Sequence, residues 1–419
     1  MISQYLIYLS EQNQARQRDR RSLICMTTPS DPVAAQNAPE IPTENFHFCS
    51  SVAADVWHAR TNAAAYEWWY FDAISDNGRD AVVVIFLDNF VFSPRYNAAC
   101  RASIQNSKFA VQNRLEQSKI EKRKLKNEKF PALAFCYYRD GKPLYRAINE
   151  FETKDFVAGM DEPWCKMGAD HGNEFRFEST PYGNRYRLNL NANLRGGKKL
   201  AAEFEWLLVE SDLAPLTENI RFERQHFWNL VAPRADVTGK IEIFEAKQSD
   251  LLDQIEFRGT GYHDHNLDTR WLPATVAEWQ WGRAHFADAT VVFYRYRETK
   301  RDAALTRLFL VRENQLTSLD AAFAASRPFR NLFGIKYPRQ LDFSGDNRVS
   351  LAVTQSNVVD ASFFYLRFLS EMRLDLGDGK VRETIGMTEH LAPRSLNWRS
   401  LDWLVNMRIG RMGRGAFLP

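Results

Sequence analysis

Apolar residues alternate with polar ones between residues 186 and 206, and this pattern limits the possible folds of the chain more than any other. A period of two places the apolar side chains on one face of a β-strand and leaves the other face to water. Gly196 and Gly197 interrupt the alternation, and glycines supply the positive backbone angles of a tight turn. The segment is therefore predicted to form an antiparallel hairpin with one buried face.

Further strands are predicted on both sides of this hairpin. Residues 66–74 and 81–92 flank the turn dipeptide Asn77-Gly78. Later strands are predicted at residues 241–244, 279–285, 290–296, 305–311, 349–353, 363–368 and 381–387, the last following the turn Asp378-Gly379. Two consecutive sets of antiparallel strands indicate an all-β protein built from two barrels or sandwiches. We place the first domain at residues 46–235 and the second at residues 236–395.

The remaining segments depart from the strand pattern. Residues 1–45 are expected to be a disordered leader and linker, with Met1 and Met26 both open as the start. Residues 111–129 are charged and helix-prone, which favours a solvated insertion. Residues 396–412 carry an apolar stripe at helical spacing among arginines, so the tail at 396–419 is predicted to be a helix. Docking of this helix on the barrels is the favoured interpretation, and binding to a membrane surface is the alternative.

Charge and cysteine content exclude several classes of protein. A net charge of +3 gives no reason to expect nucleic acid as a partner. The 5 cysteines form no CxxC pair and are expected to be reduced, mostly buried thiols. No apolar stretch is long enough to span a bilayer. We therefore expect a cytoplasmic protein, with peripheral association at the inner membrane left open, and the sequence does not indicate its number of subunits.

The aromatic segment YEWWYFD at residues 66–72 indicates an apolar ligand site. On a strand, Tyr66, Trp68, Tyr70 and Asp72 share one face, while Glu67, Trp69 and Phe71 share the other. Each aromatic residue alone is adequately explained as core, but two aromatic faces mean that neither is freely solvated. The two carboxylates need partners if they are buried.

Two later segments hold candidate chemical groups. HFWN at residues 226–229 projects His226 and Trp228 together from a strand, and GYHDHN at residues 261–266 projects Tyr262 with Asp264. His263 and His265 lie on the opposite face and form a candidate metal pair, with His285 or Asp268 as a third ligand. No third ligand has a characteristic spacing, so we interpret these histidines as hydrogen-bonded structural residues and predict no metal.

These motifs together resemble a known family. YEWWYFDA, FSPRY at residues 92–96, HFWN, GYHDHN and EWQWGRA at residues 278–284 occur in the order typical of carotenoid 1,2-hydratases (hydroxyneurosporene synthases). The resemblance extends from about residue 46 to 411. It includes the wider lipocalin-like superfamily, to which pericyclases of the Diels–Alderase type also belong. It implies two tandem lipocalin-like antiparallel β-barrels with an apolar pocket near their junction.

The resemblance also implies a reaction and its residues. The hydratases add water to the terminal alkene of an acyclic carotenoid without a redox cofactor, and their functional residues correspond to His226, Trp228, Tyr262 and Asp264. A carboxyl group in an apolar pocket can stay protonated, so Asp264 is the expected general acid. Trp228 and Tyr262 would face the developing cation, and His226 would hold the water or take its proton.

The expected partner is an apolar polyene or isoprenoid, and no cofactor is expected. The predicted substrate-binding residues are Tyr66, Trp68, Trp69, Tyr70, Phe92, Trp279 and Trp281. Two alternatives remain open for the same pocket. One is a pericyclase or cyclase, in which Asp264 and His226 act as hydrogen-bond donors and no water is added. The other is a lipid-binding protein without catalytic activity.

Overall fold

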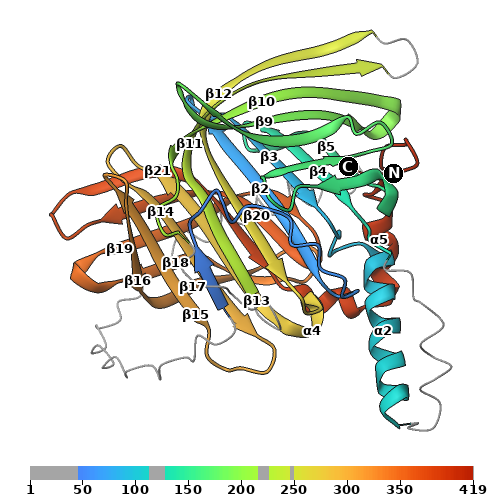
Figure 1. Cartoon of the computed structure of the whole chain (residues 1–419). Helices are drawn as coiled ribbons and strands as arrows, with labels where there is room; N and C mark the ends of the chain where they lie inside the picture. The colour runs from blue at the N-terminus through green and yellow to red at the C-terminus, as the bar shows by residue number, and fades with distance from the viewer. Residues whose placement is uncertain (1–45, 113–127, 216–225, 246–249, 419) are drawn as a thin grey trace, which may run out of the picture. The chain divides into compact units, whose positions relative to one another are not determined.

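The computed structural model describes all residues of the chain except 1–45, 113–127, 216–225, 246–249 and 419. The predicted leader therefore lies outside the described residues, as does most of the predicted insertion at 111–129. The described chain is an all-β fold of two curled, lipocalin-like antiparallel sheets with a short helix near the C-terminus, which confirms the predicted fold class (Figure 1).

The first sheet contains 13 of the described strands, in the order β22-β5-β4-β3-β2-β12-β11-β10-β9-β8-β7-β6, with β1 paired to β11. Their bounds are β1 Phe46–Cys49, β2 Tyr66–Ser75, β3 Asp80–Leu87, β4 Ala132–Arg139, β5 Lys142–Glu150, β6 Phe156–Ala158, β7 Trp164–Met167, β8 Asn173–Thr180, β9 Gly183–Asn193, β10 Lys198–Glu210, β11 His226–Glu245, β12 Leu251–Asp268 and β22 Gly410–Arg411. The pairs β1–β11 and β22–β5 are parallel. The aromatic strand β2 lies beside β12, which carries the GYHDHN motif.

The second sheet contains 9 described strands in the order β16-β15-β14-β13-β21-β20-β19-β18-β17. Their bounds are β13 Val276–His285, β14 Thr290–Glu298, β15 Leu305–Arg312, β16 Gln315–Asp320, β17 Ala322–Arg330, β18 Lys336–Ser344, β19 Ser350–Ala361, β20 Tyr365–Asp375 and β21 Val381–Leu391. The chain passes between the sheets after Asp268, through the one-turn helix α4 Leu272–Thr275. The boundary that we predict after residue 235 falls within β11, which pairs with β10 and β12 in the first sheet.

The predicted hairpins are present. Gly78 has a φ of 70° and its amide donates to the Ser75 carbonyl at 2.8 Å, which closes the turn between β2 and β3. β9 pairs with β10 around the predicted two-glycine turn. In both cases the turn residues and the alternation are local in sequence, so sequence patterns predict them well.

A helix that the sequence analysis does not predict, α2 Pro94–Gln112, follows β3. Ser93 precedes it and Pro94 opens it, and the Arg95 amide donates to the Ser93 hydroxyl at 3.2 Å. Serine before a helix and proline in its first turn are favoured because they suit the unpaired amides there.

The C-terminal tail is less helical than the predicted helix at 396–412. Its elements are the 3-10 turns η5 Pro393–Asn397 and η6 Arg399–Leu401, the helix α5 Asp402–Asn406 and the strand β22. Leu396, Val405 and Ile409 are buried in the core that the two sheets share, so this segment packs on the barrels. Another short 3-10 turn, η2 Thr153–Asp155, precedes β6, and η3 Arg195–Gly197 and η4 Asp346–Arg348 lie in hairpin loops.

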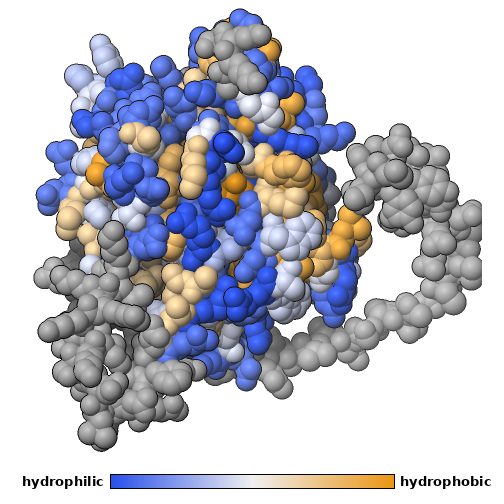
Figure 2. Space-filling view, turned by 90° about the vertical axis from the view of Figure 1, so that its right-hand side faces the viewer, coloured by the Kyte–Doolittle hydropathy of each residue, from blue (hydrophilic) through white to orange (hydrophobic). Residues whose placement is uncertain are grey.

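Three large apolar clusters organise the interior. One lies within the first sheet, one within the second, and the third contains residues of both sheets together with the C-terminal segment. The four described cysteines, Cys49, Cys100, Cys136 and Cys165, are buried free thiols, as predicted. No helix among the described residues combines the length and apolar character needed to cross a bilayer. The face shown in Figure 2 is mainly hydrophilic, with apolar areas scattered between hydrophilic side chains.

Candidate active site

The carboxyl group of Asp264 is the centre of the candidate site. Its Oδ2 accepts hydrogen bonds from Trp228 Nε1 at 2.9 Å and from the Tyr262 hydroxyl at 2.7 Å. Its Oδ1 accepts a bond from Asn266 Nδ2 at 3.0 Å. Trp281 Nε1, from the second sheet, donates to the Tyr262 hydroxyl at 3.3 Å. Both sheets therefore help to fix one buried carboxyl group.

The strand period explains this arrangement. Tyr262, Asp264 and Asn266 occupy alternate positions of β12, so all three project from the same face. Pairing places Asp264 opposite Tyr70 of β2 and Asn266 opposite Trp228 of β11. The motifs that lie far apart in the sequence thus meet across three neighbouring strands.

Burial changes the protonation of Asp264. Only 4% of the residue is exposed, and removal from water disfavours the charged form. The hydrogen bonds from Trp228 and Tyr262 act in the opposite direction, but the net effect raises the pKa of Asp264 from 3.8 to about 7. A carboxyl group with such a pKa is present in both its acid and base forms near neutral pH, which suits proton transfer.

His226 lies in the same aromatic surroundings but does not touch Asp264 directly. Its Nε2 is 2.5 Å from the Tyr294 hydroxyl, and its Nδ1 is 3.7 Å from an Asp268 oxygen. Its ring stacks on Tyr296 at 5.1 Å between centroids. Tyr294 in turn stacks on Trp228 at 4.6 Å, which connects the histidine to the acid. Burial lowers the pKa of His226, so the neutral imidazole is favoured.

Aromatic side chains from both sheets surround these groups. Tyr66 stacks on Trp68 at 5.1 Å and Trp68 on Trp279 at 5.6 Å, while Tyr70 packs edge-on against Trp281 at 5.3 Å. The Tyr66 and Tyr70 hydroxyls and Trp279 Nε1 are buried without a hydrogen-bond partner among the described residues. Unpaired buried donors are costly, so they mark places where a bound molecule or water would be stabilised.

The two remaining predicted binding residues lie apart from this group. Phe92 is half-buried and packs against Phe364 at 4.7 Å, at the margin of the shared core. Trp69 points from the opposite face of β2, stacks on His265 at 4.8 Å and belongs to the core of the first sheet. Neighbouring strand residues face opposite sides, so Trp69 lies on the face of β2 that points away from Asp264, and its assignment as a binding residue stays a prediction.

Behind the Asp264 face lies a buried polar cluster. His263 Nε2 is 3.0 Å from Asp55 Oδ2, and His265 Nδ1 is 3.1 Å from Asp55 Oδ1. His265 Nε2 is 2.9 Å from Glu67 Oε1, which also lies 2.6 Å from His58 Nδ1. Burial alone would lower the pKa of His265, but hydrogen bonds to the two carboxylates raise it to about 9.

The third metal ligands considered from sequence do not join this cluster. His285 Nε2 is 2.8 Å from the Pro233 carbonyl, and Asp268 pairs with Arg270 at 2.8 Å. Sequence spacing misses the true neighbours His58 and Asp55 because they come from the loop before β2.

Two further parts of the site have only weak sequence signals. The predicted strand at 290–296 contains Tyr294, but nothing in its spacing indicates a contact with His226. Arg367 lies 5.8 Å above the Tyr70 ring, donates to the Tyr138 hydroxyl at 2.9 Å and pairs with Glu389 at 2.9 Å. The sequence predicts that Glu67 and Asp72 need partners if they are buried. Both are buried, and both have partners.

The partner of Asp72 is Arg283 of β13. The guanidinium Nε donates to Asp72 Oδ1 at 2.8 Å, and both side chains are buried. Because Asp72 lies on the same face of β2 as Tyr70, this ion pair joins the first sheet to the second beside the aromatic site.

The fold and this site define a class of protein: an all-β, lipocalin-like chain whose two sheets surround a buried, protonatable carboxyl group with aromatic residues. The family model described as "Carotenoid hydratase CrtC" matches residues 208–417, which is half of the chain. The chain belongs to this carotenoid hydratase family, and the resemblance in the sequence motifs is thereby confirmed. The matched part contains all four predicted catalytic residues and the whole second sheet.

Relatives agree with this assignment. The chain is 26% identical over 379 residues to "Hydroxyneurosporene dehydrogenase" of Chlorobaculum tepidum, covering 85% of this chain and 90% of the relative. It is 30% identical over 104 residues to "Acyclic carotenoid 1,2-hydratase" of Cereibacter sphaeroides, but this covers only 25% of this chain and 33% of the relative. Among solved structures, an AttH-type protein of Nitrosomonas europaea matches with a TM-score of 0.50 and 15% identity, covering 87% of this chain and 99% of that chain. This last likeness concerns the fold alone.

Proposed function

We propose that this protein is a hydratase that adds water to the terminal carbon–carbon double bond of an acyclic carotenoid or related isoprenoid. The observation that carries the proposal is the buried Asp264 carboxyl group, whose pKa is raised to about 7 among aromatic side chains. Hydration of an unactivated alkene requires a positioned proton donor that is still protonated near neutral pH and an environment that tolerates a cation, and these features of the site support the proposal. Family membership supports the same reaction class.

In the proposed first step, protonated Asp264 transfers its proton to the less substituted carbon of the double bond. Oδ2 already accepts bonds from Trp228 and Tyr262, whereas Oδ1 accepts a single bond from Asn266. We therefore assign the transferable proton to Oδ1. The two donors on Oδ2 then stabilise the carboxylate that is left, since hydrogen bonds to the charged form favour it.

The second step is capture of a tertiary carbocation by water. Trp228 and Tyr262 are bonded to Asp264, and Trp281 packs against Tyr262 at 5.0 Å between ring centroids. We propose that these rings stabilise the cation, and each desolvated cation–π contact would contribute about 2 kcal/mol. Neutral His226, with Nε2 at the Tyr294 hydroxyl, is the proposed base that orients the water. His226 takes the proton that the water loses and releases it to solvent, and the Asp264 carboxylate takes up a proton again, so atoms and charge balance over one turnover. Hydration leaves the oxidation level of the substrate unchanged, and we propose that it requires no redox cofactor.

The proposed substrate approaches through the less buried aromatic residues. Trp68 and Phe92 are the two predicted binding residues that remain partly exposed, whereas Tyr66 and Tyr70 are buried. The site side chains are in mutual contact, so a polyene reaches Asp264 only when some of the aromatic rings move. An apolar substrate of this kind would be delivered from a membrane or a micelle.

The test is incubation of the purified protein with lycopene or neurosporene in detergent micelles, with products identified by mass. We expect a product that has gained one water, formed about 10²–10⁴-fold more slowly by Asp264→Asn. An isomer of unchanged mass would indicate a cyclase, and loss of hydrogen would indicate a dehydrogenase. Stoichiometric binding without conversion would indicate a lipid-binding protein. Each of these three results would overturn the proposal.

A further inference from the structure

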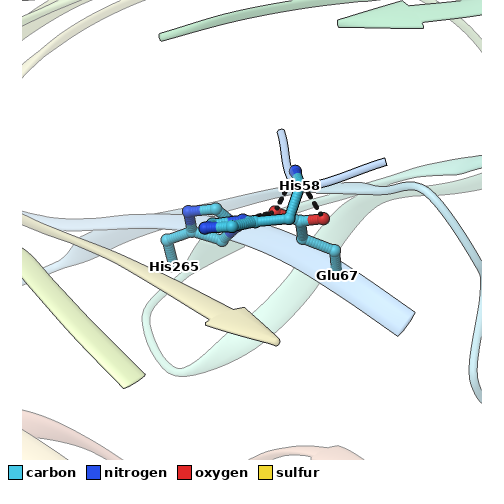
Figure 3. Close-up of side chains that lie close together, drawn as sticks. All are labelled: His58, Glu67 and His265. Carbon is cyan, nitrogen blue, oxygen red and sulfur yellow. Dashed lines mark hydrogen bonds and ion pairs between the residues drawn. The ribbon is translucent and has the colours of Figure 1, made fainter. Parts of the chain in front are cut away.

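His58, Glu67 and His265 form a second site on the face of β2 and β12 that points away from Asp264. One potential ligand atom from each residue lies within 4.8 Å of the other two. Glu67 Oε1 is 2.6 Å from His58 Nδ1 and 2.9 Å from His265 Nε2 (Figure 3). Ligands about 2.1 Å from a tetrahedral ion lie about 3.4 Å apart, so Glu67 Oε1 needs to separate from each histidine nitrogen by less than about 1 Å to admit an ion.

The surroundings already orient these three groups. The second ring nitrogen of His265 is 3.1 Å from Asp55 Oδ1, so His265 is held by a carboxylate on the side opposite Glu67. Metal-binding histidines are typically fixed by such a carboxylate, which sets the tautomer and raises the basicity of the ligand nitrogen. The His58 amide is 3.2 Å from both oxygens of Glu67, which fixes the carboxylate plane.

The charges of the buried carboxylates around these three residues are a separate reason to expect a bound cation. Asp55, Glu67 and Asp88 are buried within this region, and the Glu67 amide donates to Asp88 Oδ1 at 2.8 Å. Lys129 Nζ lies 2.6 Å from Asp88 Oδ2. Three carboxylates are thus buried close together, and buried negative charges need compensation, to which a divalent cation can contribute.

We propose that His58, Glu67 and His265 bind a divalent transition-metal ion, for which Zn²⁺ is the best match. Two imidazoles and one carboxylate are a known donor set for zinc, which leaves a fourth position for water. His58 keeps 13% of its side chain exposed and gives the ion a route from solvent. The ion would tie the loop before β2 to β2 and β12, directly behind the strand that presents Asp264. Its role is structural, and it takes no part in the hydration chemistry.

The test uses the full-length chain without a polyhistidine tag. The protein is treated with a chelator, dialysed, and titrated with ZnCl₂ by calorimetry and with CoCl₂ by visible absorption. We expect one equivalent of either metal, cobalt bands typical of four-coordinate nitrogen and oxygen ligation, and a higher Tm with Zn²⁺. His58→Gln and Glu67→Gln should each weaken binding about tenfold or more. The matched control is His171→Asn, at an exposed histidine with a φ of 53°, where asparagine is tolerated.

Metal binding and Tm are measured without an activity assay, so a failure of the metal-site proposal can be distinguished from a failure of the hydratase proposal. Circular dichroism establishes that each variant is folded before titration. The proposal is overturned if the wild-type protein binds neither metal, or if folded His58→Gln and Glu67→Gln bind as tightly as the wild type. It is also overturned if His171→Asn weakens binding as much as they do.

Discussion

The substitution Asp264→Asn tests the role of the buried acid most directly. Asparagine has the same shape and still offers Trp228 and Tyr262 an acceptor, but it cannot deliver a proton. Loss of a general acid costs about 10²–10⁴-fold in rate, which is about 3–5 kcal/mol of transition-state stabilisation. We expect kcat to fall by this factor with little change in KM, because the aromatic contacts to substrate remain.

The same substitution has a predicted signature in stability. The pKa of Asp264 rises from 3.8 to about 7 on folding, so the folded protein binds a proton between these values that the unfolded chain has released. Stability from this group is therefore present at low pH and is lost as pH rises from about 4 to about 7. A difference of about three pKa units corresponds to about 4 kcal/mol. Asp264→Asn has no carboxyl group to ionise at this position, so its free energy of unfolding should not show this fall with rising pH.

The assay is urea unfolding of the wild type and Asp264→Asn at pH 5 and pH 8. From pH 5 to pH 8, the difference in unfolding free energy between variant and wild type should shift in favour of the variant by about 2.5 kcal/mol, because the rest of the loss already occurs below pH 5. The matched control Asp302→Asn, at an exposed aspartate, should show no such change. If the two variants had the same pH dependence, Asp264 would not be protonated in the folded protein, and its assignment as the acid would be wrong.

Three further changes probe the site and its support. Trp228→Phe keeps the ring but removes the N–H that stabilises the Asp264 carboxylate, so the upper limb of the pH profile of kcat/KM should move to higher pH; an unchanged profile would contradict this. Tyr294→Phe removes the hydroxyl bonded to His226, and transition-state stabilisation, measured from kcat/KM in a steady-state assay, should fall by about 1–3 kcal/mol. An unaltered kcat/KM would exclude a role for this bond. Arg283→Met leaves the buried Asp72 carboxylate without its partner and should lower the free energy of unfolding in urea by about 3–5 kcal/mol. The double variant with Asp72→Leu should recover most of this loss. If it recovers none, the packing of the arginine and not the ion pair accounts for the loss.

The fold was predictable to a large extent because its signals are local. The alternation at 186–206 and the turn at Gly78 each fix a hairpin within a few residues of sequence, and both hairpins are present. The helix α2 was missed because its start signal, Ser93-Pro94, was interpreted only as part of a family motif. The C-terminal helix was overestimated because an apolar stripe at helical spacing can also be formed by short turns that pack on a core.

The residues of the candidate site could be predicted only where the two-residue period of a strand alone decides which face a side chain points to. Tyr262 and Asp264 share a face because they lie two apart on β12, and the structure joins them by a 2.7 Å hydrogen bond. The contacts of Asp55 could not be predicted, because it reaches His263 across 208 residues of sequence from a loop. Such long-range contacts leave no periodic trace, and loops have no fixed side-chain direction.

The pairing of β12 with β2 runs without interruption from Gly259 opposite Ser75 to Asp268 opposite Tyr66. Asp264 and His265 are consecutive on this strand, so two chemically different environments are separated by the thickness of one backbone. A single-residue insertion or deletion within the paired segment would exchange them, turning the histidines toward the aromatic rings and the acid toward the carboxylates. Variation in this protein is therefore expected to proceed by substitution along β12, and changes of length should be confined to the ends of the strand.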